Sequence, residues 1–461
     1  MPPDKAGIIP RLLYSSAFSR LPDAPLKQAQ PTDRSPRPSA CPGLWRIVAA
    51  RDGGICRIKL AGGLLLAEQA EAVALAAERY AGGVIEATNR ANLQIRGIGA
   101  DHAGLIEHLL AAGLGPRDAA GDDVRNLMLS PLAGLDAGML YDTQPLAGQI
   151  LHLLETTPRL HQLSAKFAVQ LDGGEHLAML EHPHDLWLSA IRQGAQTWLC
   201  FGLAGCPAHG PALGMVPAEQ GLALVRAVLE RFLDLATPEQ ARMRQLLADY
   251  PVARFLQGLS VRFSDAPAGW RRTTAHSPWL GVLAQHPGTA LGVAPPLGRL
   301  TPAMLRALAA IARQWGDGSL RLTPWQSVII PSLAPRQADQ AVQALAAQGM
   351  LCATDHPLAQ VTACTGASGC AKGLADTKAD AVTLAAQLRL GTPGAVHLSA
   401  CPRSCAAAHV APATLLARSP GRYDLYLRDA RVPGFGRLRA SDLTPEEAGA
   451  MLDLPTEHFD D

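Results

Sequence analysis

The sequence has no excess of charge of either sign and no long hydrophobic run. Its 41 Lys and Arg residues almost balance its 40 Asp and Glu residues, so the formal net charge is +1. A nearly neutral chain has no overall attraction for nucleic acid or for an anionic membrane surface, and we expect neither as a partner. No stretch of roughly 18 uninterrupted apolar residues occurs, so we expect no membrane span.

The start of the sequence also lacks a secretory signal, which would have a compact apolar core followed by small residues at a cleavage site. Residues 1–39 are instead rich in Pro, Ser and mixed charge, and we expect them to form a disordered arm. The protein is therefore expected in the cytoplasm. Its 9 cysteines are too sparse in 461 residues to form a disulfide scaffold.

The sequence does contain a large apolar fraction and an internal repeat. Hydrophobic residues make up 48% of the chain, enough for a substantial core in roughly three domains. The segment GLLLAEQAEAVALAAERYAGGVIEATNRANLQIRGI (63–98) aligns without gaps with GRLTPAMLRALAAIARQWGDGSLRLTPWQSVIIPSL (298–333). Each copy has the pattern of an amphipathic helix, a glycine turn and an alternating strand. The repeat predicts two ferredoxin-like α+β halves related by a pseudo-two-fold axis.

A fainter repeat follows each of these segments. It aligns residues 125–154 with 361–388, and residues 184–190 with 423–429. On this alignment Ser130 stands over Cys364 and Asp136 stands over Cys370. Two related halves have therefore kept thiols in one copy only, and we expect a functional site in that copy.

Four of the cysteines form two close pairs, with Cys364 and Cys370 spaced C-x5-C, and Cys401 and Cys405 spaced C-x3-C. The first spacing is longer than the short cysteine turn typical of structural zinc sites. It suits a loop that wraps around a larger inorganic group. In the second, the thiols would fall about one helical turn apart and could share one face. From spacing alone, an iron–sulfur cluster, a zinc ion and four metal-free buried thiols all remain open.

These patterns divide the chain into seven expected segments. They are a disordered arm (1–39), ferredoxin-like half 1 (40–115), larger catalytic half 1 (120–235), a helical linker (236–275), ferredoxin-like half 2 (276–350), larger cysteine-containing half 2 (355–440) and a C-terminal tail (441–461).

The cysteine motifs CTGASGC and HLSACPRSC resemble the cluster motif of the nitrite/sulfite reductase superfamily, whose reductases use sirohaem. EATNRANLQIRGI (86–98) resembles its T-x-R-Q-x-x-Q signature, with Ala91 in place of the first Gln, and VRNLMLSPLAG and LSAKFAVQLDGG resemble two further motifs. The resemblance covers about residues 40–430. It implies the duplicated α+β fold of that superfamily. It also implies a [4Fe–4S] cluster held by Cys364, Cys370, Cys401 and Cys405.

The resemblance also implies a cationic pocket for the carboxylates of a tetrapyrrole. The matching positions are Arg57, Arg90, Gln94, Arg125 and Lys166. A guanidinium can bind a carboxylate through two parallel hydrogen bonds, and a lysine adds a mobile charge. Arg90 and Gln94 have the even spacing that places two side chains on one face of a strand. Lys59 and Arg96 are weaker candidates.

Other stretches distinguish members of the superfamily. The reductases carry a lysine that helps deliver protons at the position of Ala168. RPSACPGLWRIVAARDGGICRIKLAGG (37–63), LRLTPWQSVIIP (320–331) and YDLYLRDAR (423–431) resemble the precorrin-3B synthase family, although Gln326 replaces an Arg and the segment after Cys405 differs.

The latter resemblance implies a monooxygenase that converts precorrin-3A to precorrin-3B with O2. It implies a mononuclear non-haem iron beside the [4Fe–4S] cluster, and an electron donor such as a reduced pyridine nucleotide system or ferredoxin. Sirohaem is expected only if the protein is instead a sulfite or nitrite reductase. The sequence does not identify ligands for the non-haem iron, and we expect His397 and His409 to serve local structure rather than to bind it.

Overall fold

The computed structural model describes five stretches of the chain. They are residues 41–116, 118–273, 278–285, 288–388 and 395–452. The arm expected over residues 1–39 lies outside these described residues. Within them, no helix has both the length and the apolar character needed to cross a membrane.

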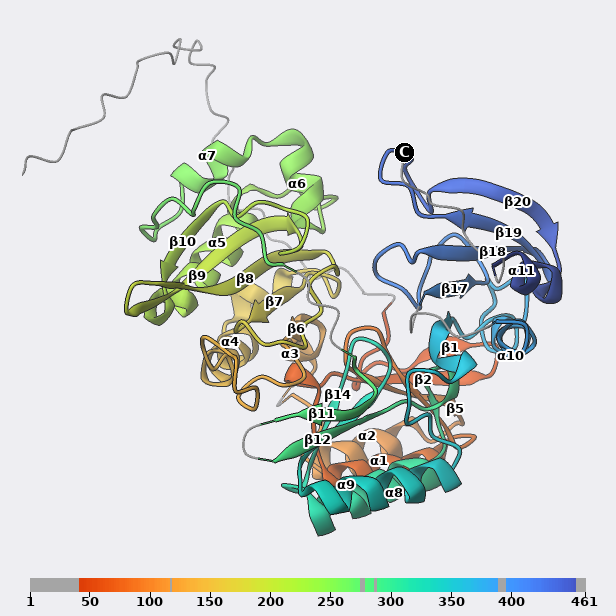
Figure 1. The fold of residues 1–461 in the computed structure, drawn as a ribbon. Helices are drawn as coiled ribbons and strands as arrows, with labels where there is room; N and C mark the ends of the chain where they lie inside the picture. Colours follow the sequence, from red (N-terminus) through yellow and green to blue (C-terminus); the bar gives the residue numbers. More distant parts are fainter. Residues whose placement is uncertain (1–40, 117, 274–277, 286–287, 389–394, 453–461) are drawn as a thin grey trace, which may run out of the picture. The chain divides into compact units, whose positions relative to one another are not determined.

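Four five-stranded sheets organise the described residues (Figure 1). The sheet of ferredoxin-like half 1 has the order β1 (Val48–Ala50), β2 (Gly53–Ile58), β5 (Leu93–Ile98), β4 (Val84–Ala87) and β13 (Arg299–Leu300). The sheet of ferredoxin-like half 2 has the order β11 (Gly281–Ala284), β12 (Thr289–Val293), β15 (Val328–Leu333), β14 (Ser319–Leu322) and β3 (Leu64–Leu66). Each sheet thus takes its last strand from the other half.

This exchange ties the two ferredoxin-like halves into one core. The segments η1 (Ala61–Gly63) and η4 (Pro296–Gly298) lead into the exchanged strands β3 and β13. Four helices cover one face of the two sheets (Figure 1): α1 (Ala67–Tyr80), α2 (His102–Ala111), α8 (Pro302–Trp315) and α9 (Pro335–Ala347). A single cluster of buried apolar side chains spans both halves, which therefore share one hydrophobic core.

Matching turns join β4 to β5 and β14 to β15. The Thr88 hydroxyl accepts a hydrogen bond from the backbone N–H four residues later at 3.1 Å, and the Thr323 hydroxyl accepts the equivalent bond at 3.4 Å. Ala91 and Gln326 occupy the same place in the two turns, with φ of 55° and 58°. Positive φ is uncommon for residues other than glycine. The internal repeat therefore extends to individual hydrogen bonds and backbone angles.

The other two sheets form the larger halves. The sheet of larger half 1 has the order β10 (Gly214–Pro217), β9 (Gln196–Gly205), β8 (His184–Gln193), β7 (Val169–Asp172) and β6 (Leu127–Met128). The sheet of larger half 2 has the order β16 (Val361–Ala363), β17 (Val396–Ser399), β18 (Ala413–Ser419), β19 (Arg422–Leu427) and β20 (Arg437–Leu443). In each, the first three strands in chain order are parallel and the later pairings are antiparallel.

This topology makes β8 the counterpart of β18. The sequence alignment of residues 184–190 with 423–429 pairs β8 with β19, so it is wrong by one strand. The error arises because consecutive half-buried strands share the same period of two, which leaves the strand order unspecified.

Further helices complete the larger halves. Larger half 1 contains α3 (Ala119–Val124), α4 (Gln144–Thr156), η2 (Pro158–Gln162), η3 (Ala218–Gln220), α5 (Gly221–Leu235), α6 (Met243–Asp249) and α7 (Val252–Gln257), and larger half 2 contains η5 (Pro357–Gln360), α10 (Thr377–Ala385) and α11 (Pro445–Leu452). Met243 and Phe255 are fully buried in the core of larger half 1, and Ala448 is fully buried in that of larger half 2. Both larger halves therefore extend into the segments expected as a linker (236–275) and a tail (441–461).

Candidate functional site

The first cysteine pair, Cys364 and Cys370, lies at the two ends of a loop that follows β16. The Cys370 N–H donates to the Gly366 carbonyl at 2.9 Å, which closes a turn inside the loop. Gly366 has φ of 74°, and a Cβ there would lie 2.7 Å from the Thr377 backbone nitrogen. Only glycine therefore permits both the backbone angle and the approach of this loop to α10.

The second cysteine pair, Cys401 and Cys405, follows β17 in a series of turns. The Ser399 hydroxyl donates to the Cys401 carbonyl at 2.8 Å, and Ser404 has φ of 51°. The residues between the two thiols are not helical, so the expectation that they share a helical face is wrong. Glycine-free turns with a positive φ, rather than helix periodicity, set the positions of this pair.

The four thiols gather at one place. Burial raises the pKa of Cys405, and the nearby Cys401, Cys364 and Cys370 raise it further. The Cys364 sulfur also accepts a hydrogen bond from the Ala400 N–H at 3.3 Å, which ties the two pairs together. Within the described residues, however, no three Cys, His, Asp or Glu side chains are placed to hold a single metal ion. Thiols that are close together but not around one point fit a larger inorganic group, such as a four-iron cluster with Cys₄ ligation, better than they fit zinc.

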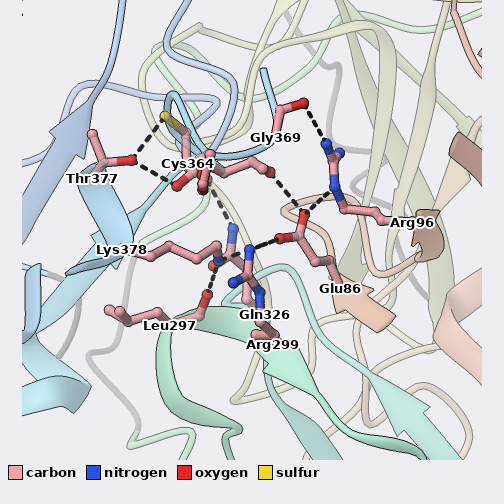
Figure 2. A network of polar contacts seen from close by, with 12 residues as sticks. Glu86, Arg96, Leu297, Arg299, Gln326, Cys364, Gly369, Thr377 and Lys378 are labelled. Atoms are coloured by element: carbon pink, nitrogen blue, oxygen red, sulfur yellow. Dashed lines mark hydrogen bonds and ion pairs between the residues drawn. The ribbon is translucent and has the colours of Figure 1, made fainter. Parts of the chain in front are cut away.

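Ferredoxin-like half 1 fastens the loop of the first cysteine pair (Figure 2). Arg96 donates to the Gly369 carbonyl at 3.0 Å, and Arg51 donates to the Ala367 carbonyl at 2.8 Å. Arg96 also forms two hydrogen bonds of 2.9 Å with Asp52. Arg96, a weaker candidate for tetrapyrrole binding, is thus occupied in holding this loop.

Glu86 lies at the centre of this contact (Figure 2). Its carboxylate accepts a hydrogen bond from Thr365 at 2.9 Å and lies 3.1 Å from Arg299 and 3.6 Å from Lys378. Burial alone would raise the pKa of Glu86, but Lys378, Arg96 and Arg299 hold it below its ordinary value. The pKa of Lys378 is lowered, because the effect of burial is larger than the opposite effect of Glu86. One buried carboxylate therefore joins ferredoxin-like halves 1 and 2 to larger half 2.

The two matching turns hold the segment after the second cysteine pair. The Asn89 amide donates to the Cys405 carbonyl at 3.2 Å, and the Gln326 amide donates to the Ala406 carbonyl at 3.4 Å. Gln326 and the residues after Cys405 are two places where the sequence departs from the precorrin-3B synthase pattern. Because Gln326 contacts this segment, the two departures from the family pattern belong to one altered contact.

Partly buried cations lie beside this segment. Arg57 and Gln94 are paired across β2 and β5, and the Gln94 oxygen, in the amide orientation that satisfies both groups, accepts two hydrogen bonds from Arg57 at 3.0 and 2.7 Å. Arg90 lies in the turn before β5, so the expectation that Arg90 and Gln94 share a strand face is wrong. Burial, together with the neighbouring Arg242 and Arg57, lowers the pKa of Arg90 to about 10. In the part of the chain that is described, we find no hydrogen bond or ion pair from the Arg90 guanidinium. It is a partly buried cation, and the carboxylate of Asp185 is near enough to act against the lowering of its pKa.

A small hollow, which we call the cation cavity, opens beside Arg90. It is lined by Arg90, Asn92, Arg125, Asn126, Leu127, Met128, Ala168 and His184 and has a volume of about 10 Å³, close to that of a single water site. Arg125 pairs with Glu155 (2.7 Å between Nε and Oε1), but its Nη1 has no hydrogen-bond partner in the described structure. Small-molecule pockets hold roughly 300–1,000 Å³. The cation cavity is far smaller than such pockets, so it does not enclose a tetrapyrrole, and only the charged groups at its mouth could meet one.

Two of the expected cations lie elsewhere. Lys166 is exposed and does not line the cation cavity. Lys59 is buried and donates to the Asp122 carbonyl, and burial lowers its pKa to about 8. The structure thus brings together Arg57, Arg90, Gln94 and Arg125 and leaves Lys166 apart.

A larger open hollow carries the wrong charge for a polyanion. It is lined by Pro116, Asp118, Gly121, Gly148, Leu151, His152, Glu155, Thr156, Pro158 and His161. Among the described residues of its lining, the charged side chains are the carboxylates of Asp118 and Glu155, and none is a Lys or Arg. The smaller cation cavity is therefore the better candidate site.

The sequence reading missed His184, which lines the cation cavity. Its Nδ1 donates to the His182 carbonyl at 2.8 Å, which leaves Nε2 as an acceptor toward the cavity. Burial and the nearby Arg90 lower the pKa of His184 to about 3, so the ring is neutral at physiological pH. The segment His182-Pro-His184 carried the only signal, and a pair of histidines at the start of a strand is too common to indicate a site.

Larger half 1 has no thiols at the corresponding place. Ser130, the counterpart of Cys364, donates to the Leu177 carbonyl at 2.6 Å. Asp136, the counterpart of Cys370, accepts hydrogen bonds from the Gly138 and His176 N–H groups at 2.7 Å each. Both side chains are buried and hydrogen-bonded within their own half.

Comparisons with known proteins agree with this architecture. Residues 120–266 match the family described as the nitrite and sulphite reductase 4Fe-4S domain. Residues 49–113 and 283–348 each match the nitrite/sulfite reductase ferredoxin-like half domain. Two separate matches to one half domain confirm the internal repeat.

The relatives and a solved structure cover most of the chain. The ferredoxin–nitrite reductase of Synechococcus elongatus is 30% identical over 84% of this chain and 80% of its own length. The precorrin-3B synthase of a Sinorhizobium species is 28% identical over 88% of this chain and 86% of its own length. The structure of Mycobacterium tuberculosis NirA has the same fold, with a TM-score of 0.73 and 23% identity over 87% of this chain and 79% of its own. The chain therefore belongs to the nitrite/sulfite reductase superfamily and is an oxidoreductase of that family with a 4Fe-4S domain.

Proposed function

We propose that the protein is an iron–sulfur monooxygenase that converts precorrin-3A to precorrin-3B during aerobic cobalamin biosynthesis. In this reaction one atom of O2 becomes a hydroxyl at C20 and a ring A acetate closes a γ-lactone, while the other atom is reduced to water with two protons and two electrons from the external donor. The observation that carries the proposal is Ala168, which is buried in the wall of the cation cavity together with Arg90 and Arg125. A methyl group stands there in place of the lysine that helps the reductases deliver protons.

The proposal gives each part of the site a separate task. Cys364, Cys370, Cys401 and Cys405 hold a [4Fe–4S] cluster, which when bound supplies single electrons. Arg90 and Arg125 bind carboxylates at the edge of the substrate. Arg125 Nη1 has no acceptor in the described structure, and among the described contacts we find none from the Arg90 guanidinium to an acceptor. Arg57, fixed by Gln94, adds positive charge behind Arg90. An external donor, such as a reduced pyridine nucleotide system or ferredoxin, resupplies the cluster with the electrons that the reaction consumes.

A sirohaem-dependent nitrite or sulfite reductase is the second candidate. It is favoured by the 30% identity to a cyanobacterial ferredoxin–nitrite reductase and by 27% identity to a mycobacterial sulfite reductase. The visible spectrum of the purified protein separates the candidates, because a sirohaem protein shows strong Soret absorption. We expect only the broad brown absorption of an iron–sulfur cluster. A stoichiometric Soret band would reject the proposed function and support the reductase.

Turnover with labelled oxygen tests the proposed reaction directly. Purified protein with its cluster intact, a chemical or enzymatic reductant, precorrin-3A and 18O2 should yield product with one 18O atom, in the C20 hydroxyl. The same reaction with unlabelled O2 in 18O-labelled water is the control. Product without label from 18O2 would contradict the monooxygenase assignment.

Replacing Arg90 by Ala should weaken binding of the tetrapyrrole. Arg90 is a partly buried cation whose guanidinium has no hydrogen bond in the described structure, and truncating one partner of a desolvated charged contact costs about 2–4 kcal/mol, or roughly thirty- to several-hundred-fold in Kd. Equilibrium titration with precorrin-3A, followed by absorption, measures the change. Lys166→Ala is the matched control because Lys166 is exposed outside the cation cavity, and it should bind nearly as the wild type does. Unchanged affinity of R90A would exclude Arg90 from the substrate site.

A further inference from the structure

Lys378 carries a buried positive charge beside the first cysteine pair (Figure 2). It is the second residue of α10 and is only 9% exposed. Lysine is almost never buried unless its charge is paired. The Lys378 ammonium donates to the Leu297 carbonyl at 2.6 Å and lies 3.6 Å from the Glu86 carboxylate. Lys378 does not line the cation cavity, so its charge has a different role from those of Arg90 and Arg125.

The start of α10 places Lys378 close to one of the thiols. Thr377, the residue before it, donates to the Cys364 carbonyl at 2.8 Å, and the same hydroxyl lies 3.4 Å from the Cys364 sulfur. Burial lowers the pKa of Lys378, and the nearby Glu86 and Cys364 act in the opposite direction. The lysine is therefore within electrostatic reach of the Cys364 thiolate.

The charged groups around Lys378 do not cancel. Three cations meet two carboxylates, which leaves these five groups with one positive charge in excess; they are Lys378, Arg96 and Arg299 with Glu86 and Asp52. Arg299 lies 3.1 Å from the Glu86 carboxylate, and Arg96 lies 2.9 Å from the Asp52 carboxylate. Lys378 lies farther from its partner, at 3.6 Å. The excess charge therefore resides mainly on Lys378.

A cation beside an iron–sulfur cluster favours reduction of that cluster. Reduction adds one negative charge to a centre that already has the charge of four thiolates, so net charge and hydrogen bonds to sulfur set its potential. The attraction between this added charge and a cation is far larger inside a protein than in water. The hydrogen bond from the Ala400 N–H to the Cys364 sulfur acts in the same direction.

We propose that Lys378 raises the reduction potential of the iron–sulfur cluster held by the four thiols, and that Glu86 positions its ammonium group. Lys378 acts through its charge at Cys364 and is a positioning residue rather than a catalytic residue. The inference rests on the assignment of the cluster to the four thiols. It does not rest on the monooxygenase reaction, so it applies equally to a nitrite or sulfite reductase.

An anaerobic redox titration tests this role without substrate or O2. Protein with its cluster intact is reduced stepwise with dithionite in the presence of mediator dyes, and the EPR signal of the reduced cluster gives the midpoint potential. Lys378→Gln removes the charge but keeps a hydrogen-bond donor. It should lower the equilibrium constant for reduction by roughly tenfold, which is about 59 mV for one electron. Lys378→Arg keeps a permanent charge and should retain the wild-type potential.

The direction of the shift separates an electrostatic role from a structural one. If Lys378→Gln only loosened α10 and let water reach the cluster, the high dielectric constant of water would stabilise the more negative reduced form and raise the potential. Lys372→Gln is the matched control. Lys372 lies two residues after Cys370 but is exposed, so water and salt screen its charge, and the potential should stay close to that of the wild type.

The visible absorption of the cluster shows whether each variant retains it. If Lys378→Gln loses the cluster, Arg299→Gln decides, because the Arg299 side chain is 38% exposed and belongs to the same group of cations. Its potential should also fall. An unchanged or raised potential in the variant that retains the cluster, or an equal fall in Lys372→Gln, would overturn the inference, as would a wild type without a cluster. The expected shifts in a protein without oxygenase activity would support the inference and reject only the proposed function.

Discussion

Cys401→Ser should abolish both the iron–sulfur absorption and the enzymatic activity of the protein. Cys401 belongs to the set of four thiols whose mutual influence raises the pKa of Cys405. A serine hydroxyl is a harder and far less acidic donor than a thiol, so it does not replace a thiolate on iron. Iron and sulfide analysis of anaerobically purified protein, together with its visible spectrum, measures the loss. The wild type should contain four sulfide ions per chain, and the variant should contain almost none.

Cys352→Ser is the matched control for this substitution. Cys352 is a partly buried thiol in ferredoxin-like half 2, and its sulfur contacts the carbonyl oxygens of Val342 and Met350 at 3.8 and 3.7 Å. A hydroxyl can make the same contacts, so iron, sulfide and activity should match those of the wild type. Full sulfide content in C401S, or equal loss in both variants, would contradict the assignment of the four thiols.

Local patterns in the sequence were sufficient to predict the repeated parts of the fold. The alignment of residues 63–98 with 298–333 predicted two copies of one strand–helix–strand unit, and each copy is present with matching turns at Thr88 and Thr323. The exchange of β3 and β13 was not predictable. A two- or three-residue edge strand has no period that specifies which sheet it joins, and the partner is decided by packing in the shared core.

The candidate site was predictable only where its members are close together in the sequence. Two cysteine pairs with flanking glycines are a local signal, and the structure gathers their thiols. Glu86 had no signal, because a single glutamate in a strand is usually solvent-exposed. Its partner Lys378 comes from another half, so their proximity depends on tertiary packing. Lys166 fits a motif, yet its side chain is exposed.

Glu86→Ala should lower the free energy of unfolding by about 3–5 kcal/mol, because removing one partner of a buried ion pair leaves the others uncompensated. Glu86 is 7% exposed, and Arg299 and Lys378 lie 3.1 and 3.6 Å from its carboxylate. Arg96 retains Asp52, so the cost arises mainly from the other two cations. Loss of the Thr365 hydrogen bond should also loosen the loop of the first cysteine pair and speed cluster loss to an iron chelator.

Denaturant unfolding near neutral pH measures this cost, and Glu78→Ala is the matched control. Glu78 pairs with Arg306 on the surface, where water screens the charges, so its replacement should change stability little.

The pH dependence is a second test. The folded pKa of Glu86 is below its ordinary value of 4.5, so its stabilisation is present above that pH and is lost as the pH falls through the lower folded value. The gap between wild type and Glu86→Ala should therefore persist at pH 5–7 and shrink only in stronger acid. Two results would contradict this role of Glu86 as the buried anion that joins the ferredoxin-like halves to larger half 2. One is a difference in stability between wild type and Glu86→Ala that disappears already at pH 6, and the other is an equal loss of stability in Glu86→Ala and Glu78→Ala.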